Sequence, residues 1–292
     1  MTGIALALVL GSATLHATWN FLFKRAYDKS AFAWLFGIAA VVIYLPVFVI
    51  AATRLEISTQ GWLVVVASGV AHTLYFFLLG YGYSVGDLSL VYPLARGIGP
   101  LLVPVWAVLF LGERLSATGV AGIAAVVAGV YVLHLRELSW PGLLAPLRSI
   151  GTRPTRIALA SGVVISIYTV VDKVGVSHFE PFVYMYMWMI LYALLYAPIV
   201  LKTSGWEAVK KEWRLNAVPV VVVGFLIVFT YTMVLFAMTM SNVSYVASAR
   251  EVAVVIGALL GTVFLKESYG RSKMSGAVLI AIGITLIALA KS

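Results

Sequence analysis

The sequence predicts an all-α polytopic membrane protein in which ten transmembrane helices form two inverted five-helix repeats. Three observations lead to this fold class. Of the 292 residues, 62% are hydrophobic and the mean hydropathy is +1.04, whereas soluble domains average about 45–50% apolar residues. Ten apolar runs each have roughly the 20 residues that a helix needs to cross a bilayer. The second half of the chain also repeats features of the first half.

The ten runs extend over the whole chain and are separated by short polar connections. Helices are required because every backbone polar group in lipid must find its partner within the segment. The first run lies within MTGIALALVLGSATLHATWNFLF and lacks a basic segment before it, so we interpret it as a retained span and not as a signal peptide. The expected spans are 3–23, 31–53, 61–83, 89–111, 117–135, 157–174, 181–201, 216–239, 243–265 and 273–290.

The connection 136–156 is rich in proline and arginine and divides the chain into repeats at 1–147 and 148–292. A shift of 154 residues places Arg96 on Arg250. Each half has five spans, and this odd number means that the second half enters the membrane in the opposite orientation. Such inverted repeats are typical of secondary transporters, with the substrate site near the midplane. The same shift also pairs Glu113 with Glu267, Gly122 with Gly276 and Gly129 with Gly283.

The charge distribution predicts the orientation and disfavours several functions. The net charge is +9, and most lysines and arginines lie in the connections on one side of the membrane, which puts both termini outside the cytoplasm. This role for the basic residues makes nucleic-acid binding improbable. The chain has no cysteine and four dispersed histidines, so we expect neither a disulfide nor a metal site, and no cofactor.

Three ionisable residues lie deep within predicted spans: Arg96, Arg250 and Glu251. A charge at the bilayer centre costs roughly 2.5–3.5 kcal/mol on insertion scales, so such residues normally mark a transport pathway. The guanidinium fork suits a carboxylate, and we expect Arg96 and Arg250 to bind one in the substrate. Glu251 is the candidate for proton coupling. The alternative is that Arg250 and Glu251 pair with charges on neighbouring helices and only hold the bundle together.

Polar and aromatic residues inside the spans are further candidates for substrate binding. His16, Trp19 and Asn20 share one helix face, and so do His72 and Tyr75. The alternative is ordinary hydrogen bonding between helices, which is worth about 0.6 kcal/mol on average. Rings that could stack on an aromatic substrate, or simply fill the bundle, are Tyr92, Tyr168, Trp188 and Tyr245.

Two further expectations concern span ends and bends. Asp172 and Lys173 lie near the end of the expected span 157–174, where we interpret them as anchors at the membrane surface. The expected span 89–111 contains Pro93, Pro100 and Pro104. We expect these prolines to bend that span.

The chain resembles the drug/metabolite transporter superfamily in its ten-span EamA-type form. The resemblance rests on Trp19 and Lys24 at the end of the first span, on Leu111-Gly112-Glu113 with its counterpart Leu265-Lys266-Glu267, and on the five-plus-five repeat. It implies a carrier for small metabolites, often an amino-acid exporter, and most closely the aromatic amino-acid exporters of the YddG type. Many members are thought to keep both termini in the cytoplasm, which conflicts with the charge distribution.

The predicted function is therefore that of a secondary transporter in the bacterial inner (plasma) membrane. It moves small amphipathic metabolites, foremost amino acids and among them aromatic ones, by alternating access and in the direction of export. Its partners are the small-molecule substrate, the lipid bilayer and protons. The alternatives are an intramembrane enzyme, for which paired carboxylates or a nucleophile beside a base are missing, and a receptor or channel, which the inverted repeat disfavours.

Overall fold

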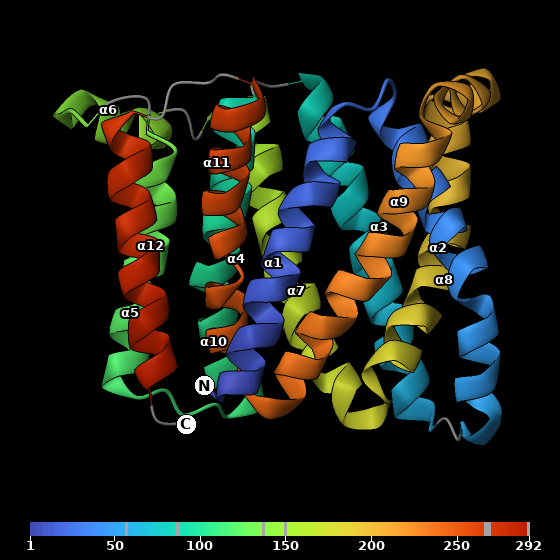
Figure 1. Cartoon of the computed structure of the whole chain (residues 1–292), viewed down its shortest axis with the longest axis horizontal. Helices are drawn as coiled ribbons and strands as arrows, with labels where there is room; N and C mark the ends of the chain where they lie inside the picture. Colours follow the sequence, from blue (N-terminus) through green and yellow to red (C-terminus); the bar gives the residue numbers. More distant parts are fainter. Residues whose placement is uncertain (56–57, 86–87, 136–137, 149–150, 266–269, 291–292) are drawn as a thin grey trace.

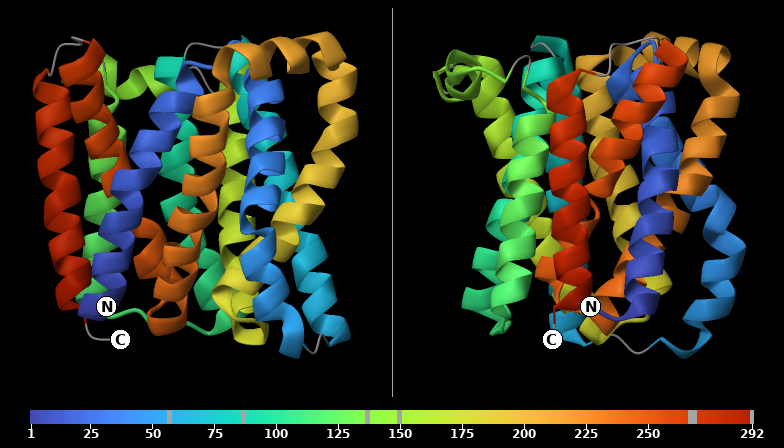
Figure 2. Two further views of the ribbon diagram at one scale, coloured as in Figure 1. Left: turned by 45° about the vertical axis from the view of Figure 1, so that its right-hand side comes forward. Right: turned by 60° about the vertical axis from the view of Figure 1, so that its left-hand side comes forward.

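The protein is an all-α bundle whose long helices run side by side in alternating directions (Figure 1). The structure is a computed structural model that describes residues 1–55, 58–85, 88–135, 138–148, 151–265 and 270–290. The side chains of 54, 83–85, 88–96, 145–148, 260–261 and 263–265 lie outside this description. Both termini lie at the same end of the bundle (Figure 2), and the Met1 ammonium donates to the Ala290 carbonyl at 3.1 Å.

Ten membrane crossings can be traced through the described residues. Seven of the helices there are long and apolar enough to span a membrane, and Gly97–Leu111 and Ala117–Leu133 are shorter apolar segments. This confirms an all-α polytopic membrane protein. The crossings are α1 (Gly3–Lys24), α2 (Lys29–Ala51), α3 (Thr59–Val85), α4 (Leu88–Leu111), α5 (Ala117–Leu133), α7 (Arg153–His178), α8 (Pro181–Thr203), α9 (Gly205–Met240), the pair α10 (Val243–Ala249) and α11 (Val252–Leu265), and α12 (Arg271–Leu289).

Several boundaries differ from the expected spans. The connection after α5 contains a short helix, α6 (Trp140–Arg148). Helix α7 runs to His178, four residues past the expected end. Helix α9 begins at Gly205 and has a non-helical residue, Asn216, at the position where the expected span begins. The part of α9 before Asn216 therefore belongs to the connection that follows α8, and the part after Asn216 forms the membrane crossing. A short 3₁₀ helix, Ala52–Arg54, also follows α2.

The ninth crossing is interrupted at Arg250 and Glu251, between α10 and α11. The backbone there makes tight i→i+3 hydrogen bonds, from Glu251 N to Ser248 O at 3.1 Å and from Val254 N to Glu251 O at 3.0 Å. The fourth span is one continuous helix, α4, and the bend that we expected at its prolines stays a prediction. A short 3₁₀ stretch inside a helix often marks a hinge, and here it carries two of the predicted charges.

The Leu-Gly-Glu motif at the end of α4 anchors the first half of the interrupted crossing. Gly112 has a φ of 65°, a conformation that glycine adopts without steric cost. The Glu113 carboxylate accepts from Val243 N at 2.5 Å, from Ser244 N at 3.3 Å and from Ser244 Oγ at 2.6 Å. It therefore satisfies the free N–H groups where α10 begins, and it fixes the segment that leads to Arg250.

Neighbouring helices pair as two inverted repeats would require. Helix α5 packs on α12 and α2 on α8, while the contact of α3 with α7 has its counterpart in α1 with α9. The contact of α4 with α7 is likewise matched by that of α1 with α11. When the two halves are exchanged, the first two pairs map onto themselves and each of the other contacts becomes its observed counterpart. This supports the inverted repeat; the division at residues 147 and 148 stays a prediction.

Glycines bring α5 and α12 into backbone contact. A Cβ added at Gly122 would lie 2.7 Å from Gly283 O, and one at Gly129 would lie 2.8 Å from Gly276 O. Because the repeat pairs Gly122 with Gly276 and Gly129 with Gly283, exchanging the halves turns one contact into the other. Small residues at helix interfaces are a common packing device in membranes, and these contacts leave no room for a side chain.

We expect Gly122→Ala to lower the stability of the folded protein by about 1–3 kcal/mol, because the new methyl group overpacks the α5–α12 contact. The matched control is Gly257→Ala, since nothing lies within 4 Å of a Cβ there, and alanine favours the helix. Thermal unfolding in detergent measures both. Equal midpoints for the two variants would show that the glycine contact does not limit packing.

We expect Glu113→Gln to destabilise the protein by about 1–3 kcal/mol, because the amide nitrogen cannot accept the hydrogen bonds made by the start of α10. The control is Glu207→Gln, at an exposed site where the carboxylate only pairs with Lys210 at 2.9 Å and which should leave the unfolding midpoint unchanged. Protease sensitivity of the α9–α10 connection gives a second readout. A wild-type cleavage pattern in Glu113→Gln would contradict the anchoring role.

Candidate functional site

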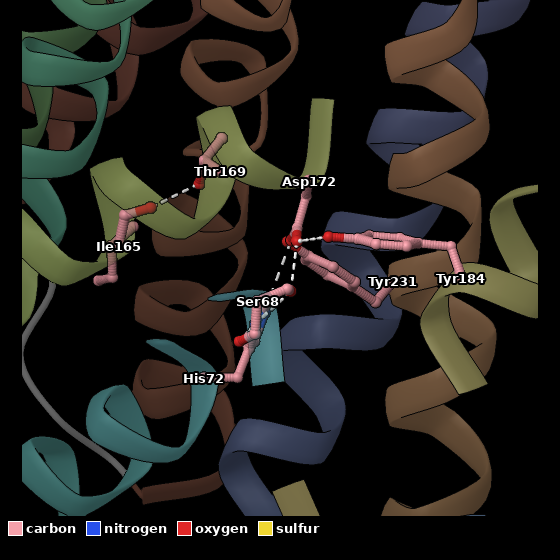
Figure 3. A network of polar contacts seen from close by, with 7 residues as sticks. All are labelled: Ser68, His72, Ile165, Thr169, Asp172, Tyr184 and Tyr231. Carbon is pink, nitrogen blue, oxygen red and sulfur yellow. Dashed lines mark hydrogen bonds and ion pairs between the residues drawn. The ribbon is translucent and has the colours of Figure 1, made fainter. Parts of the chain in front are cut away.

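The candidate site has two parts that share one residue, Tyr231. The first part is a hollow on the inner side of α1, α9 and α11. Its lining residues are Ser12, Ala13, His16, Thr230, Tyr231, Val234, Arg250 and Ala253. The second part lies behind Tyr231 and is a buried group of polar side chains, which we call the Asp172 network. It consists of Ser68, His72, Asp172, Tyr184 and Tyr231 (Figure 3).

Asp172 is the centre of this network and is fully buried. Its carboxylate accepts hydrogen bonds from Ser68 Oγ at 2.6 Å, from Tyr184 OH at 2.8 Å and from the Tyr231 hydroxyl. Figure 3 shows the three hydroxyl groups converging on it. The donors belong to α3, α8 and α9, and Asp172 belongs to α7, so one carboxylate holds four helices together.

His72 lies beside the carboxylate with a defined ring orientation. Its Nδ1 is 3.0 Å from the Ser68 carbonyl oxygen, and because a carbonyl only accepts, Nδ1 carries a hydrogen. This hydrogen is assigned from the hydrogen-bond pattern. The other ring nitrogen, Nε2, is 3.7 Å from Asp172 Oδ2. His72 thus faces a buried carboxylate with the nitrogen that can gain a second proton.

Aromatic rings enclose His72. Trp188 stacks on it with ring centroids 3.8 Å apart, Tyr168 lies at 4.1 Å, and Tyr231 approaches edge-on at 5.6 Å. Tyr75 in turn contacts Tyr168 with a centroid distance of 5.6 Å. The structure therefore brings together four of the predicted residues, His72, Tyr75, Tyr168 and Trp188, from three different helices.

Arg250 lines the hollow from the interruption between α10 and α11. Its guanidinium carbon is 5.2 Å from the centre of the Tyr231 ring, an arrangement that stabilises a cation by about 0.5–2 kcal/mol. Within the described part of the chain no carboxylate forms an ion pair with Arg250. The alternative interpretation, that Arg250 only joins two helices through a carboxylate, has no contact to support it there.

The polar stripe predicted on α1 is present beside the hollow. His16 lines the hollow itself, its Nε2 lies 3.0 Å from the Asn20 amide nitrogen, and its ring meets Trp19 edge-on at 4.6 Å. Glu251 is 4% exposed and follows Arg250 in the interruption. Its coupling role stays a prediction.

Of the other predicted residues, Tyr245 lies elsewhere in the described structure, and two more cannot be compared with the site. Tyr245 packs between α5 and α12, and its hydroxyl accepts from Ser116 N at 3.1 Å, so it serves the contact between α10 and the start of α5. Arg96 and Tyr92 lie on α4, but their side chains fall outside the described residues. The pairing of Arg96 with Arg250 across the repeat therefore stays a prediction.

Sequence reasoning missed Asp172, Ser68 and Tyr231. We expected Asp172 to be a surface anchor because we ended its span at residue 174; the longer α7 places it inside the bundle. A usable signal was present in the spacing. Tyr168 and Asp172 are four residues apart, as are Ser68 and His72, and polar pairs at this spacing share one helix face.

The model of the EamA-like transporter family matches the chain twice, over residues 3–135 and 156–289. The chain is 37% identical over 91 residues to the multidrug resistance protein mmr of Mycolicibacterium paratuberculosis, covering 30% of this chain and 84% of that protein. It is also 37% identical over 90 residues to the nicotine metabolites export pump subunit NepA of Paenarthrobacter nicotinovorans, covering 30% of this chain and 78% of that protein.

A third relative is the multidrug resistance protein EbrB of Bacillus subtilis, 31% identical over 101 residues, with 34% of this chain and 86% of that protein covered. Among solved structures, one crystal structure of a protein with no stated function superposes on 98% of this chain and 95% of its own, with a TM-score of 0.67 and 19% identity. At this identity the likeness shows the fold alone.

Together these findings show an integral membrane transporter and not an enzyme. They bear out the predicted resemblance, because the two family matches include most of the chain and leave out the connection between α5 and α7. The chain belongs to the EamA-like transporter family, within the drug/metabolite transporter superfamily.

Proposed function

We propose that this protein exports small amphipathic metabolites that carry a carboxylate, foremost amino acids and among them aromatic ones, by alternating access across a bacterial inner membrane. The observation that carries the proposal is Arg250, a guanidinium that lines an intramembrane hollow and stacks on Tyr231. The names of the bacterial relatives, a metabolite export pump subunit among them, support the direction and the membrane.

Arg250 has the chemistry to bind the substrate carboxylate. The guanidinium stays charged in any membrane environment, and its planar fork donates two parallel hydrogen bonds to a carboxylate. An intramembrane charge is costly and marks a substrate pathway by default. Stacking on Tyr231 holds the guanidinium at the hollow, so a carboxylate that enters there meets a positioned partner.

Other groups near the hollow fit the rest of an amphipathic substrate. His16 and Asn20 offer hydrogen-bonding groups on α1, and the Tyr231 ring offers aromatic surface at the hollow. The indole N–H groups of Trp19 and Trp188 are buried and have no hydrogen-bond partner among the residues that the structure describes. Buried donors of this kind call for a water or a ligand, which supports a role for both indoles in binding.

The interruption of the ninth crossing supports alternating access. The α10–α11 junction carries Arg250, and its backbone makes i→i+3 hydrogen bonds. Small backbone changes there would therefore reorient one half-helix and move Arg250. By the repeat, Arg96 on α4 is the counterpart of Arg250, and we assign it, with Tyr92 one helical turn before it, to the other half of the cavity. Transport would then expose the same site to each side in turn.

Arg250→Gln tests this proposal in proteoliposomes. We expect counterflow of labelled L-phenylalanine to fall at least about tenfold, because the charged hydrogen bonds to the carboxylate are worth roughly 1.5–3 kcal/mol. Arg250→Lys should lose most of this activity too, since a lysine lacks the planar fork. Rates are normalised to the folded fraction from size-exclusion chromatography, and Arg271→Gln, at an exposed residue where α12 begins, serves as the matched control.

Phenethylamine has the same ring and amine as L-phenylalanine but no carboxylate. It therefore distinguishes a loss of carboxylate recognition from general damage to the transporter. Its counterflow in Arg250→Gln should equal that of the wild type if the wild type carries it. L-phenylalanine counterflow that survives Arg250→Gln, or a loss that only follows the folded fraction, would contradict the proposal.

A further inference from the structure

We infer that His72 and Asp172 form a proton-binding pair, and that binding of a carboxylate at Arg250 favours proton uptake by this pair. The inference deepens the proposed function and rests on its carboxylate site. It assigns proton coupling to two residues of the Asp172 network that do not line the hollow, and it differs from the expectation that Glu251 carries the proton.

The geometry of the pair leaves a place for one proton. His72 Nδ1 already donates to the Ser68 carbonyl, so Nε2 faces Asp172 Oδ2 at 3.7 Å with either a lone pair or a hydrogen. With a proton on Nε2 or on the Asp172 carboxyl group, the pair is neutral overall. Without that proton the pair carries a full negative charge. His72 is 4% exposed and Asp172 is fully buried, so water cannot screen that charge.

The three hydroxyl donors decide where the proton is held. Ser68, Tyr184 and Tyr231 all donate to the Asp172 carboxyl group, and an ionised carboxylate accepts three such bonds more readily than a protonated one. The proton therefore belongs on His72 Nε2. Its imidazolium then contacts the stacked Trp188 ring and the tilted Tyr168 ring, which favours a cation.

Tyr231 connects this pair to the hollow. Its hydroxyl donates to Asp172, its ring edge meets His72 at a centroid distance of 5.6 Å, and the Arg250 guanidinium lies 5.2 Å from its ring centre. A protonated His72 and Arg250 are like charges in one poorly screened region, so they disfavour each other. A substrate carboxylate on Arg250 cancels one of these charges, and the proton on His72 then costs less.

Other charged or titratable groups also surround the pair. Glu251 follows Arg250 in the interrupted crossing, and His16 lies on α1 across the hollow. Lys173 on α7 donates to the carbonyls of Met238 and Ser241, which turns its charge toward the α9–α10 connection. Helix α8 contributes Tyr184 and Trp188, which are uncharged. Among the described residues, Glu251 is therefore the carboxylate whose proton uptake a test must distinguish from that of the His72–Asp172 pair.

The test is equilibrium binding of L-phenylalanine to the purified wild-type protein in detergent. Calorimetry in buffers of different ionisation enthalpy counts the protons taken up on binding. We expect net uptake that approaches one proton, and an apparent affinity that rises toward acid pH by up to about tenfold per pH unit. Phenethylamine has the amine but no carboxylate and should bind without this uptake.

Variants assign the proton to the pair. Asp172→Asn and His72→Gln should each abolish the uptake and flatten the pH dependence of L-phenylalanine affinity. Glu251→Gln should keep both. The matched control is His134→Gln, which removes a histidine bonded to its own helix at Val130 and should behave as the wild type. The wild-type comparison of the two ligands needs no variant and stands even where a substitution impairs folding.

Three results would overturn the inference alone and leave the proposed carboxylate site intact. These are L-phenylalanine binding with no proton uptake, proton release in place of uptake, and uptake that disappears in Glu251→Gln but persists in Asp172→Asn and His72→Gln. Failure of the wild-type protein to bind L-phenylalanine at any pH would overturn the proposed function, and this inference with it.

Discussion

The burial of the Asp172 carboxylate is the interaction on which the rest of the site depends. Removing an ionised carboxylate from water costs several kcal/mol unless hydrogen bonds and charge offset it. Here the offset comes from hydroxyl groups of α3, α8 and α9 and from the His72 ring. Because all of these must reach one point, the carboxylate fixes how four helices meet. Tyr231 is one of the donors, so the same requirement also fixes the position of the ring on which Arg250 stacks.

The bundle combines firmly packed contacts with one interrupted crossing. Helices α5 and α12 meet through glycines at backbone distance, and such close packing resists sliding. Helix α10, by contrast, is seven residues long and is held at its beginning by Glu113. It ends beside Arg250, where the backbone changes its hydrogen-bond pattern. The cation proposed to bind substrate is therefore located at an interruption of a transmembrane crossing, beside well-packed neighbours.

Hydropathy and span count predicted the fold well, because in lipid the backbone leaves few options other than helices. Polar residues deep in spans pointed to His16, His72 and Arg250, which the structure places at or beside the hollow, and their roles in substrate binding stay predictions. The role of Asp172 was missed, because α7 ends four residues later than we expected. That difference moves the Asp172 side chain from the membrane surface to the interior of the bundle. The interruption at Arg250 was missed as well, because no proline or glycine marks it in the sequence.

A structure of the protein with bound 4-bromo-L-phenylalanine tests the central claim most directly, because the anomalous signal of bromine places the ring and the density places the carboxylate. The account predicts the ligand in the hollow, with its carboxylate oxygens within hydrogen-bond distance of the Arg250 guanidinium. A ligand bound in the hollow with its carboxylate turned away from Arg250, or bound elsewhere in the bundle, would contradict it.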